Sequence, residues 1–393
     1  MAKAAKKVGT DIELSIVLPC LNEERTVGTC VVKAMTFLKE NNIYGEVVIA
    51  DNGSADRSDE IAKSKGAKVI RVEEKGYGSA LRGGFEEAQG KYIIMADADD
   101  SYDLTNLMPF VQKLRDGYDL VIGNRFKGGI KKGAMPWHHR YIGNPVLSFI
   151  GQLFFKTPAG DFHCGLRGFT KDAITKMNLQ TTGMELASEI VIKASILGMK
   201  VCEVPVILSP DGRGRRPHLR SFRDGWRHLR FLLIYSPRWL FAYPGIILFA
   251  LGCVFSVILF FGPVNIGFRL IDFHSFILTG TMTILGINML SFSTITRVYA
   301  FNAGLLPGQP GFYWLFRYFN LERGLTIGFS ILLLGLILIG KATVLSEYPG
   351  FSIIGFNQSV RLVFGGSLAT IIGGQTVFTS FVLSILGLDV DKE

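Results

Sequence analysis

Cysteine is scarce in this chain, and no apolar signal-peptide core opens it. The 393 residues include five cysteines, an odd number, and no Cys-x-x-Cys pair occurs. They are Cys20, Cys30, Cys164, Cys202 and Cys253. A disulfide framework is therefore not indicated, and reduced thiols in a cytosolic domain fit best. The N-terminal stretch MAKAAKKVGTDIEL has no long apolar run, so we expect no secretion signal.

Charge is the second scarcity. Lysine and arginine crowd the chain before about residue 240, and charged residues are few beyond it. Overall, 48% of residues are apolar, which is high for a soluble protein. Four runs are each long enough for a helix of about 20 residues that crosses a bilayer, and soluble core helices rarely reach this length without charge. They cover about residues 240–262, 275–297, 325–345 and 362–388. The sequence therefore predicts an integral membrane protein with four transmembrane helices.

The few charges of this membrane half predict its orientation. The loop between the second and third runs contains Arg297, Arg317 and Arg323, whereas the stretch from Ser346 to Val360 contains nothing basic. Because basic loops stay on the cytoplasmic side of a membrane, we expect the N- and C-termini both to be cytoplasmic.

The soluble half, residues 11–208, alternates strand and helix patterns. Apolar strand-like runs at 13–19, 46–51, 67–72, 92–96 and 119–123 are separated by helical segments. Such alternation predicts an α/β fold, a parallel sheet covered by helices on both faces. In open sheets of this kind, ligands bind beyond the carboxyl ends of the strands. The expected parts are an α/β domain over 1–210, a basic loop and helix over 211–238 and a membrane domain over 239–393.

A polar cluster follows each of the first four predicted strands. In chain order the clusters are PCLNEE, DNGSAD, EEKGYGSALRGG and DADDSYD. Each alone is a weak signal, because DNGS is a common turn and the Gly-rich stretch matches neither a P-loop nor GxGxxG. Their joint placement at one predicted sheet edge indicates a binding site.

The fourth cluster ends a buried strand with Asp97-Ala98-Asp99. Two carboxylates two residues apart at an extended strand end point the same way, and hard divalent cations prefer such oxygens. An acidic turn that caps the following helix is the other interpretation of this motif. Beside the other clusters, the pair predicts a Mg²⁺ or Mn²⁺ site.

At PCLNEE, ADNGSADRS, GYGSALRGGFEEAQGKYIIMADADD and GNRF, in that order, the chain resembles family-2 glycosyltransferases with the GT-A fold. More narrowly, it is similar to polyprenyl-phosphate hexosyltransferases, the group of dolichol-phosphate mannose and glucose synthases. The resemblance covers about residues 13–240. It implies a cytoplasmic GT-A catalytic domain that binds a nucleotide sugar, and the four runs fit variants of the group with a four-helix membrane domain.

The resemblance implies roles for residues on the donor side of the site. Those that would contact the base or ribose are Pro19, Leu21, Glu23 and Asp51. Lys75 and Gly76 would lie near the diphosphate. Asp97, Ala98 and Asp99 form the Asp-x-Asp motif at the donor, in which the two aspartates hold the metal and are catalytic. The third metal contact would come from Ser101 or from water, or be absent.

The acceptor implied by the resemblance is a lipid phosphate, an anionic nucleophile that needs cationic positioning rather than a base. Arg125 and Arg140 match catalytic, acceptor-phosphate arginines of the family, with Asn144 beside them and Asp161 orienting this side. The arginine fork suits phosphate because it can bind two oxygens. A comparable basic loop of the family closes over the phosphates, and its candidates here are Arg213, Arg215 and Arg216.

Two segments are predicted to lie at the membrane surface. Residues 211–233 form a basic amphipathic pattern before the first span, which is typical of a helix on anionic lipids. Nucleic-acid binding is the alternative for such charge, and the neighbouring span disfavours it. PVLSFIGQLFF at 145–155 is too short to span, and is either a second interfacial helix or a core helix.

These features predict transfer of one hexose from a nucleotide sugar to polyprenyl phosphate at the cytoplasmic face, with inversion implied by the resemblance. UDP-glucose is the first choice of donor and GDP-mannose the second. A processive polysaccharide synthase, the first alternative, would carry Gln-x-x-Arg-Trp, whereas YSPRW has Tyr235 in place of the glutamine. A non-enzymatic membrane flippase or scaffold would have lost the metal carboxylates, and both are present. The sequence leaves open whether the protein forms a homo-oligomer.

Overall fold

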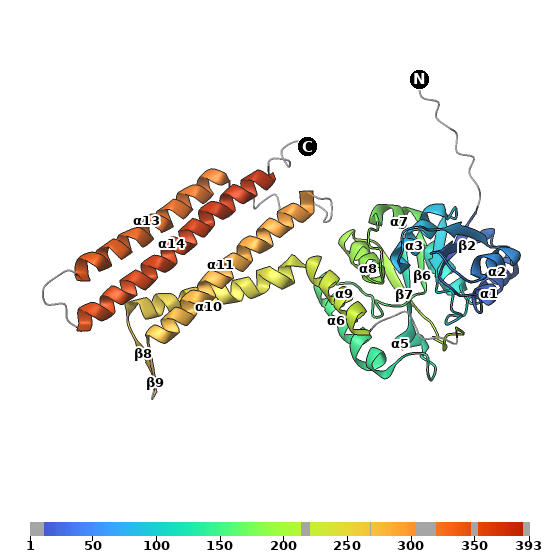
Figure 1. The fold of residues 1–393 in the computed structure, drawn as a ribbon, viewed down its shortest axis with the longest axis horizontal. Coiled ribbons are helices and arrows are strands. Elements are labelled where there is room, and N and C mark those ends of the chain that lie inside the picture. Colours follow the sequence, from blue (N-terminus) through green and yellow to red (C-terminus); the bar gives the residue numbers. More distant parts are fainter. Residues whose placement is uncertain (1–11, 214–220, 268, 303–319, 347–352, 388–393) are drawn as a thin grey trace, which may run out of the picture. The chain divides into compact units, whose positions relative to one another are not determined.

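Seven strands form one sheet in the order β3-β2-β1-β4-β6-β5-β7 (Figure 1). The computed structural model describes residues 12–213, 221–267, 269–302, 320–346 and 353–387. The chain divides into two compact units, Met1–Tyr235 and Ser236–Glu393, and the sheet belongs to the first. Its strands are β1 (Leu14–Cys20), β2 (Gly45–Asp51), β3 (Lys68–Arg71), β4 (Tyr92–Met95), β5 (Leu120–Asn124), β6 (Arg167–Thr170) and β7 (Val201–Pro205).

Six of these strands run in one direction, and β6 runs against them. β6 is antiparallel to both β4 and β5, while every other pairing in the sheet is parallel. The purely parallel sheet expected from the sequence is therefore wrong in this strand. No strand was predicted at this place, because its first residue is Arg167, which is fully buried and donates hydrogen bonds to the carbonyl oxygens of Cys164, Ala187 and Phe162 at 2.9, 2.7 and 2.6 Å. A buried arginine interrupts the apolar run that would mark a strand.

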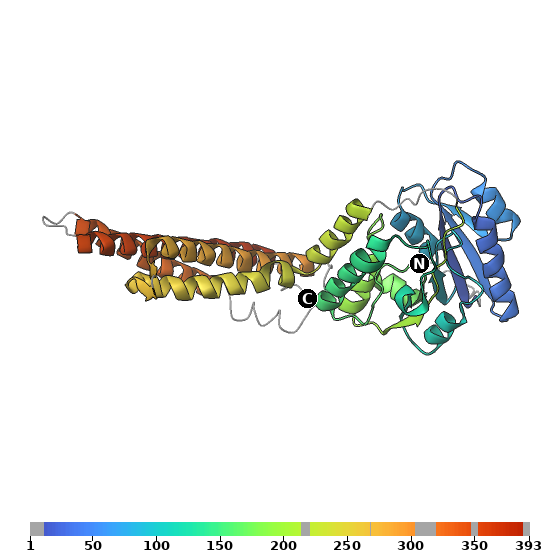
Figure 2. The same ribbon diagram turned by 90° about the horizontal axis from the view of Figure 1, so that it is seen from below.

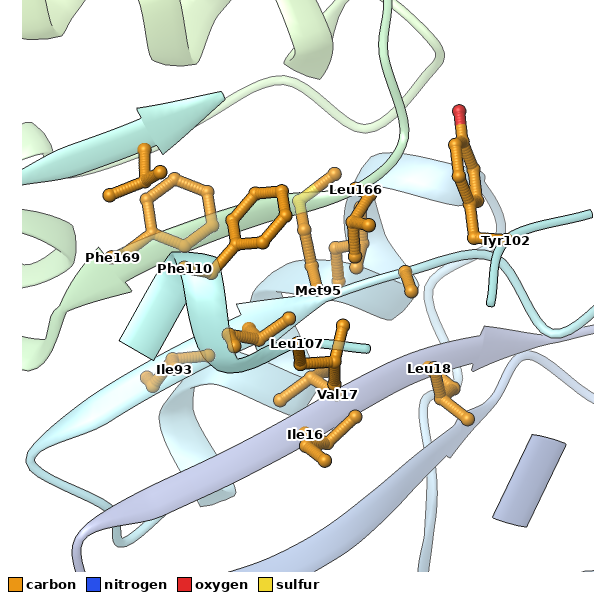
Figure 3. Packing of buried hydrophobic residues seen from close by; sticks show 14 of the residues in the cluster. Ile16, Val17, Leu18, Ile93, Met95, Tyr102, Leu107, Phe110, Leu166 and Phe169 are labelled. Carbon is orange, nitrogen blue, oxygen red and sulfur yellow. The ribbon is translucent and has the colours of Figure 1, made fainter. Parts of the chain in front are cut away.

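Helices lie on both sides of the sheet, as the α/β pattern predicts (Figure 2). The core between strands and helices is built from apolar side chains, among them Ile16, Ile93, Phe110 and Phe169 (Figure 3). Burial of each such side chain contributes about 1.5–3 kcal/mol, so the strand ends are held firmly. The helices are α1 (Val27–Glu40), α2 (Ser58–Ser64), α3 (Tyr77–Glu87), α4 (Met108–Arg115), α7 (Lys171–Met177) and α8 (Leu186–Ile196).

A shorter set of elements follows β5: α5 (Arg125–Gly128), η1 (His139–Gly143) and α6 (Asn144–Phe155). α6 buries Ser148 and Gly151 and leaves the large side chains of Val146, Phe149 and Leu153 exposed. A helix inside a core would cover such side chains. The exposed face fits the interfacial alternative for 145–155 better than the core alternative.

The basic segment before the membrane forms α9 (Ser221–Ile234), which belongs to the first unit and packs against α6 and α8. Its buried face consists of Asp224, His228 and Leu232, four residues apart. Trp226 of this helix is 58% exposed, so its ring does not pack within the unit. The beginning of the predicted pattern, with Leu219 and Arg220, lies outside the described residues.

In the described residues of the second unit, four helices are long and apolar enough to span a membrane, at Arg238–Phe261, Phe273–Asn302, Leu321–Val344 and Gly355–Leu386. All four expected transmembrane runs are therefore helical. α13 lies along α14, and α10 packs against α11 (Figure 1). The elements are η2 (Arg238–Ala242), α10 (Tyr243–Phe261), β8 (Val264–Ile266), β9 (Arg269–Ile271), α11 (Phe273–Asn302), α13 (Leu321–Ser346) and α14 (Ile353–Gly387).

Close helix contact in this unit depends on small residues. A Cβ placed on Gly252 of α10 would lie 2.5 Å from the backbone nitrogen of Thr283 in α11, and one on Gly335 of α13 would lie 2.6 Å from the carbonyl oxygen of Gly366 in α14. Ser256 and Thr279 add a hydrogen bond of 2.9 Å between α10 and α11. Small residues and interhelical hydrogen bonds of this kind hold helices together in lipid.

Candidate active site

The strand directions bring seven chain segments to one edge of the sheet. The carboxyl ends of β1, β2, β3, β4, β5 and β7 point to this edge, and so does the amino end of the antiparallel β6. The four polar clusters, Arg125 at the end of β5, and Asp161, six residues before β6, therefore meet there. The last of these could not be placed from the sequence, because it depends on the reversed strand.

Asp97 and Asp99 lie just beyond β4. The Tyr77 hydroxyl at the start of α3 donates a hydrogen bond to Asp97 Oδ1 at 3.0 Å, and the backbone N–H of Ser101 donates to Asp99 Oδ1 at 3.0 Å. Burial raises the pKa of Asp97 to about 6, and the charge of Asp99 adds to this; the Tyr77 hydrogen bond and nearby arginines oppose it. Ala98 between them is buried.

Arg213 reaches these carboxylates from the segment after β7. Its guanidinium donates to Asp99 Oδ2 and, at 3.3 Å, to Oε1 of the buried Glu23, while the Gly212 N–H donates to the Asp99 carbonyl at 2.9 Å. The Nε of Arg213 is buried without a hydrogen-bond partner. A side chain predicted for the acceptor phosphate is thus at the carboxylates predicted for metal. Arg215 and Arg216 lie outside the described residues.

The possible metal ligands at this edge are few and are carboxylate oxygens. They fit Mg²⁺ or Mn²⁺ better than a metal whose ligands all come from the protein. Among the described residues, no group of three or more His, Cys, Asp or Glu side chains could hold a metal ion. Asp97 and Asp99 provide carboxylates from one strand end, and Arg213 puts a positive charge against one of them. Mg²⁺ commonly takes one or two carboxylates and completes its shell with water and substrate phosphates. Ser101 contacts Asp99 through its backbone N–H.

The clusters after β1 and β2 contact each other. The Asp51 carboxylate accepts hydrogen bonds at 3.1 Å from the N–H groups of Gly53 and Ser54, and the N–H of Glu23 donates to Ser58 Oγ at 2.8 Å. Pro19 is the residue before the last in β1, which ends at Cys20, and Leu21 follows that strand. The acids predicted for the nucleoside pocket are therefore tied to the turn after β2.

The cluster after β3 passes close to a second loop. Gly76 has a φ of 138°, and a Cβ at this position would collide with the carbonyl oxygen of Thr182. Only glycine fits here, for both reasons. The preceding Lys75 donates from Nζ to the carbonyl oxygen of Asn52 at 2.7 Å. Lys75 and Gly76 are thereby placed at the same edge as Asp51.

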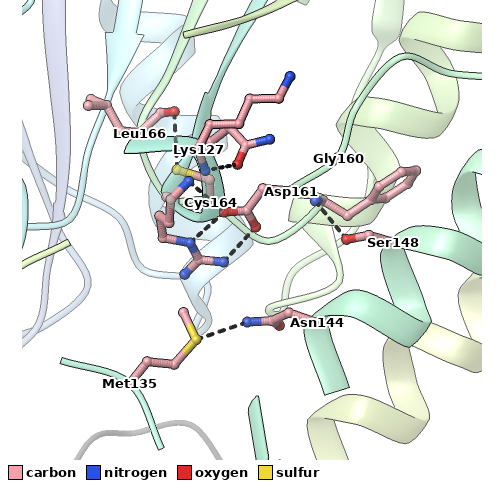
Figure 4. Close-up of polar contacts among 12 residues, drawn as sticks. Lys127, Met135, Asn144, Ser148, Gly160, Asp161, Cys164 and Leu166 are labelled. Atoms are coloured by element: carbon pink, nitrogen blue, oxygen red, sulfur yellow. Dashed lines mark hydrogen bonds and ion pairs between the residues drawn. The ribbon is translucent and has the colours of Figure 1, made fainter. Parts of the chain in front are cut away.

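On the acceptor side, Arg125 forms a bidentate ion pair with Asp161. Nε and Nη2 of Arg125 each lie 2.7 Å from a carboxylate oxygen, and the backbone N–H of Arg125 donates to Oδ2 at 3.1 Å (Figure 4). Arg125 is 8% exposed and Asp161 is fully buried. Asp161 therefore neutralises Arg125 and fixes its orientation.

The other two residues predicted for the acceptor phosphate make separate contacts. The Arg140 guanidinium lies 5.5 Å from the centre of the Tyr141 ring, and Asn144 Nδ2 lies 3.5 Å from Sδ of Met135 (Figure 4). In the described part of the chain, no hydrogen bond or ion pair joins Arg125 to Arg140 or Asn144. The structure places Arg140 in η1 and Asn144 at the start of α6, both half-buried.

Three further side chains have buried polar atoms that lack a partner. Within the described residues, Ser79 Oγ, Glu185 Oε2 and both ring nitrogens of His163 make no hydrogen bond. Such groups are rare in folded proteins, and strain, a functional role or a bound water or ion accounts for most of them. Burial lowers the pKa of His163 well below its usual value, and His228, whose ring centre is 4.4 Å away, adds to this. No sequence pattern marks a buried atom that lacks a hydrogen-bond partner, so this property is seen only in the structure.

The comparisons with known proteins agree with this arrangement. The model of glycosyl transferase family 2 matches residues 15–177, and that of the family 2 C-terminal transmembrane region matches residues 294–387. The low-salt glycan biosynthesis hexosyltransferase Agl6 of Haloferax volcanii is 38% identical over 375 residues, which cover 95% of this chain and 89% of that protein. The chain belongs to glycosyl transferase family 2 and is an integral membrane glycosyltransferase.

More distant relatives match about half of the chain. A dolichyl-phosphate hexose transferase of Haloferax volcanii is 31% identical over 197 residues, 49% of this chain and 82% of that protein. A dolichol-phosphate mannosyltransferase of Pyrococcus furiosus is 26% identical over 214 residues, 52% of this chain and 58% of that protein. The resemblance noted in the sequence is confirmed for the family and for its narrower group, and the non-enzymatic alternative is wrong.

Proposed function

We propose that this glycosyltransferase moves one hexose from a nucleotide sugar to polyprenyl phosphate at the cytoplasmic face of a membrane. The observation that carries the proposal is the meeting of two kinds of group at one sheet edge: the carboxylates of Asp97 and Asp99, and the buried Arg125–Asp161 pair. The first suits a nucleoside diphosphate with its cation, and the second a phosphate acceptor. The names of the dolichyl-phosphate relatives support a lipid phosphate.

On the donor side, Glu23, Asp51 and Lys75 hold the nucleoside and diphosphate, and Asp97 and Asp99 ligate Mg²⁺ or Mn²⁺, with Ser101 or water near them. A bound divalent cation supplies positive charge to the diphosphate oxygens. Tyr77 orients Asp97 through its hydroxyl. UDP-glucose is our first choice of donor and GDP-mannose the second.

On the acceptor side, Arg125, held by Asp161, directs its remaining N–H groups to the lipid phosphate, with Arg140 and Asn144 farther out. A phosphate oxygen attacks the anomeric carbon of the hexose while the bond from that carbon to the diphosphate oxygen breaks. The nucleoside diphosphate leaves, and the configuration inverts. The phosphate is already anionic, so no side chain has to remove a proton; the chain contributes positioning and charge.

The topology proposed for the membrane unit follows from its basic residues. Arg297 and Arg323 lie at the ends of α11 and α13 that face the same connecting segment. This end is cytoplasmic under the positive-inside rule. The exposed apolar face of α6 and the arginines of α9 then lie on the inner leaflet, where a lipid phosphate is presented.

The test is incubation of the purified full chain with a panel of labelled nucleotide sugars, polyprenyl phosphate and Mn²⁺, followed by mass analysis of the lipid product. The expected product is polyprenyl phosphate carrying one hexose, formed from UDP-glucose or, as the second choice, GDP-mannose. A lipid carrying many hexoses would identify a processive synthase. No sugar on the lipid with any donor would refute the proposal.

A further inference from the structure

The side chain of Asn52, in the turn after β2, holds the segment that follows β3. Asn52 Nδ2 donates to the carbonyl oxygens of Val72 and Glu74 at 3.0 and 2.7 Å, and Oδ1 accepts from the N–H of Gly76 at 2.8 Å. Asn52 is 4% exposed. Residues 72–76 form no helix or strand. The Val72 N–H donates to the Asp51 carbonyl oxygen at 2.8 Å, and the Asn52 amide binds three further backbone groups of the segment.

The same turn fixes the ammonium of Lys75. Lys75 Nζ donates to the Asn52 carbonyl oxygen at 2.7 Å, and a Cβ at Gly53 would collide with it. The ammonium therefore lies directly over Gly53, whose φ of 87° also favours glycine. Within the described ranges, no carboxylate forms an ion pair with Lys75. Its charge is available to an anionic ligand.

Hydrogen bonds also connect Asn52, through residues 76 and 77, to the Asp-x-Asp pair. The residue whose N–H it binds, Gly76, immediately precedes Tyr77, and the Tyr77 hydroxyl donates to Asp97. A shift of the 72–76 segment would thus move Lys75 and Tyr77 together. The amide couples the turn after β2 to both a cation and a carboxylate of the donor side.

An amide is the group that this position requires. Two of the three side-chain bonds of Asn52 are donated to carbonyl oxygens and one is accepted from an N–H. A carboxylate can accept but cannot donate. An aspartate of the same shape would face the oxygens of Val72 and Glu74 with negative charge, and the segment would have to move.

We propose that Asn52 is a positioning residue of the donor site, acting through the 72–76 segment to place Lys75 against the diphosphate and Tyr77 against Asp97. This rests on the proposed function, since the donor is taken to be a nucleoside diphosphate sugar. Asn52 itself touches no reacting atom. Its role predicts weaker donor binding, without change in acceptor binding, when the amide is altered.

The experiment compares Asn52→Asp and Asn52→Ala with the wild-type full chain, using UDP and GDP in the presence of Mn²⁺ as probes in calorimetry, together with steady-state kinetics. We expect the Kd of the nucleotide and the KM of the donor to rise by about tenfold or more, with the KM of the lipid unchanged. The matched control is Asn41→Asp, because Asn41 Nδ2 donates only to the Phe37 carbonyl at the end of α1; it should behave as wild type.

A second comparison separates positioning from general loss of structure. Lys75→Met should weaken nucleotide binding strongly in the wild type and hardly at all in Asn52→Ala, because the ammonium is already misplaced there. Additive effects, or an equal rise in donor and lipid KM, would overturn the inference. If both Asn52 variants fail to fold, the Gly53→Ala variant displaces the Lys75 ammonium while the Asn52 amide stays intact. Unchanged nucleotide affinity in the Gly53→Ala variant would also overturn the inference. Wild-type protein that binds neither nucleotide would instead refute the proposed function.

Discussion

Arg213 forms an ion pair with Asp99, 114 residues away in the sequence, and its guanidinium also reaches Glu23. The chain's own positive charge therefore lies against a carboxylate of the Asp-x-Asp pair. A divalent cation bound at the proposed site would compete with this guanidinium for the same oxygen. With metal and nucleotide bound there, Arg213 would have to give up this contact or share it.

The competition predicts that Arg213→Gln binds Mn²⁺ more tightly than the wild type when no nucleotide is present. Removing an opposing charge near the site changes the electrostatic energy by about 1 kcal/mol, or several-fold in Kd. Electron paramagnetic resonance of free Mn²⁺ measures this directly. Arg115→Gln, which breaks an exposed pair with Glu13 elsewhere, is the control and should not change the affinity. Weaker binding in Arg213→Gln would contradict the competition.

Asp97→Asn and Asp99→Asn should each lower the transfer rate by about 100-fold or more, because each removes a negatively charged oxygen ligand from the cation. Both variants should keep the wild-type melting temperature within a few degrees. Asp100→Asn is a close control, since Asp100 pairs with Lys33 of α1 at 2.7 Å and should retain most activity. Full activity in Asp97→Asn or Asp99→Asn would remove the metal assignment.

The Arg125–Asp161 pair predicts a stability effect that must be separated from catalysis. Arg125→Ala leaves the fully buried Asp161 without its ion partner, which costs about 3–5 kcal/mol. The double variant Arg125→Gln, Asp161→Asn removes both charges and should regain much of that stability. Transfer should stay low in the double variant, with the KM of the lipid raised and the Kd of UDP unchanged. Activity that recovers together with stability would show that the pair is structural.

Much of this site could be predicted from the sequence because it follows strand periodicity. A two-residue repeat places Asp97 and Asp99 on one side of an extended end, and parallel strands bring their clusters to one edge. β1, β2 and β4 lie within two residues of the predicted ranges. β6 was not predicted as a strand, because the buried Arg167 breaks its apolar pattern, and its direction could not be predicted either.

The contacts that complete the site were also out of reach of the sequence. Arg213 meets Asp99, and Arg125 meets Asp161, through turns whose direction depends on the whole sheet. Local propensity carries no information on such pairs. The role proposed for Asn52 could not be predicted for another reason. Its turn sequence, DNGS, is common, and the importance of the amide depends on the carbonyl groups that it contacts in the folded chain.

The buried imidazole of His228 in α9 predicts a loss of stability at acid pH. Its Nδ1 lies 2.9 Å from Ser188 Oγ, and burial lowers its pKa from 6.5 to about 4. The unfolded chain takes up a proton below pH 6.5, whereas the folded chain does so only near pH 4. The contribution of the neutral His228 to the free energy of unfolding is therefore complete above pH 6.5. It falls by about 1.4 kcal/mol per pH unit as the pH drops toward 4.

Melting temperatures between pH 7 and 4.5 test this prediction. His228→Asn keeps a partner for Ser188 and removes the titrating ring, so its melting temperature should fall less steeply with acid than that of the wild type. The dependence should not vanish, because the buried His163 titrates in the same direction. His138→Asn, at the half-buried start of η1, serves as the control. Parallel curves for His228→Asn and the wild type would contradict the assignment.

The membrane unit makes a separate prediction through Arg361 and Asp272. The buried Arg361 of α14 donates to the Asp272 carboxylate, just before α11, and to the carbonyl oxygen of Leu259 in α10, with its guanidinium 4.7 Å from the Phe273 ring centre. Arg361 directly follows the stretch from Ser346 to Val360, which contains nothing basic, and its charge is paired with that of Asp272. It also joins three helices at one point.

Arg361→Met should therefore lower the melting temperature in detergent markedly, because Asp272 keeps an uncompensated charge and Leu259 loses a donor. Adding Asp272→Asn should recover part of the lost stability. The charge-exchanged double variant, Arg361→Asp with Asp272→Arg, should recover less, because the aspartate side chain at position 361 is too short to reach the Leu259 carbonyl and has no N–H to donate. Lys341→Met, on an exposed position of α13, should leave stability unchanged. If Arg361→Met melts like the wild type, the pair does not hold the helices together, and their association depends on the small-residue contacts alone.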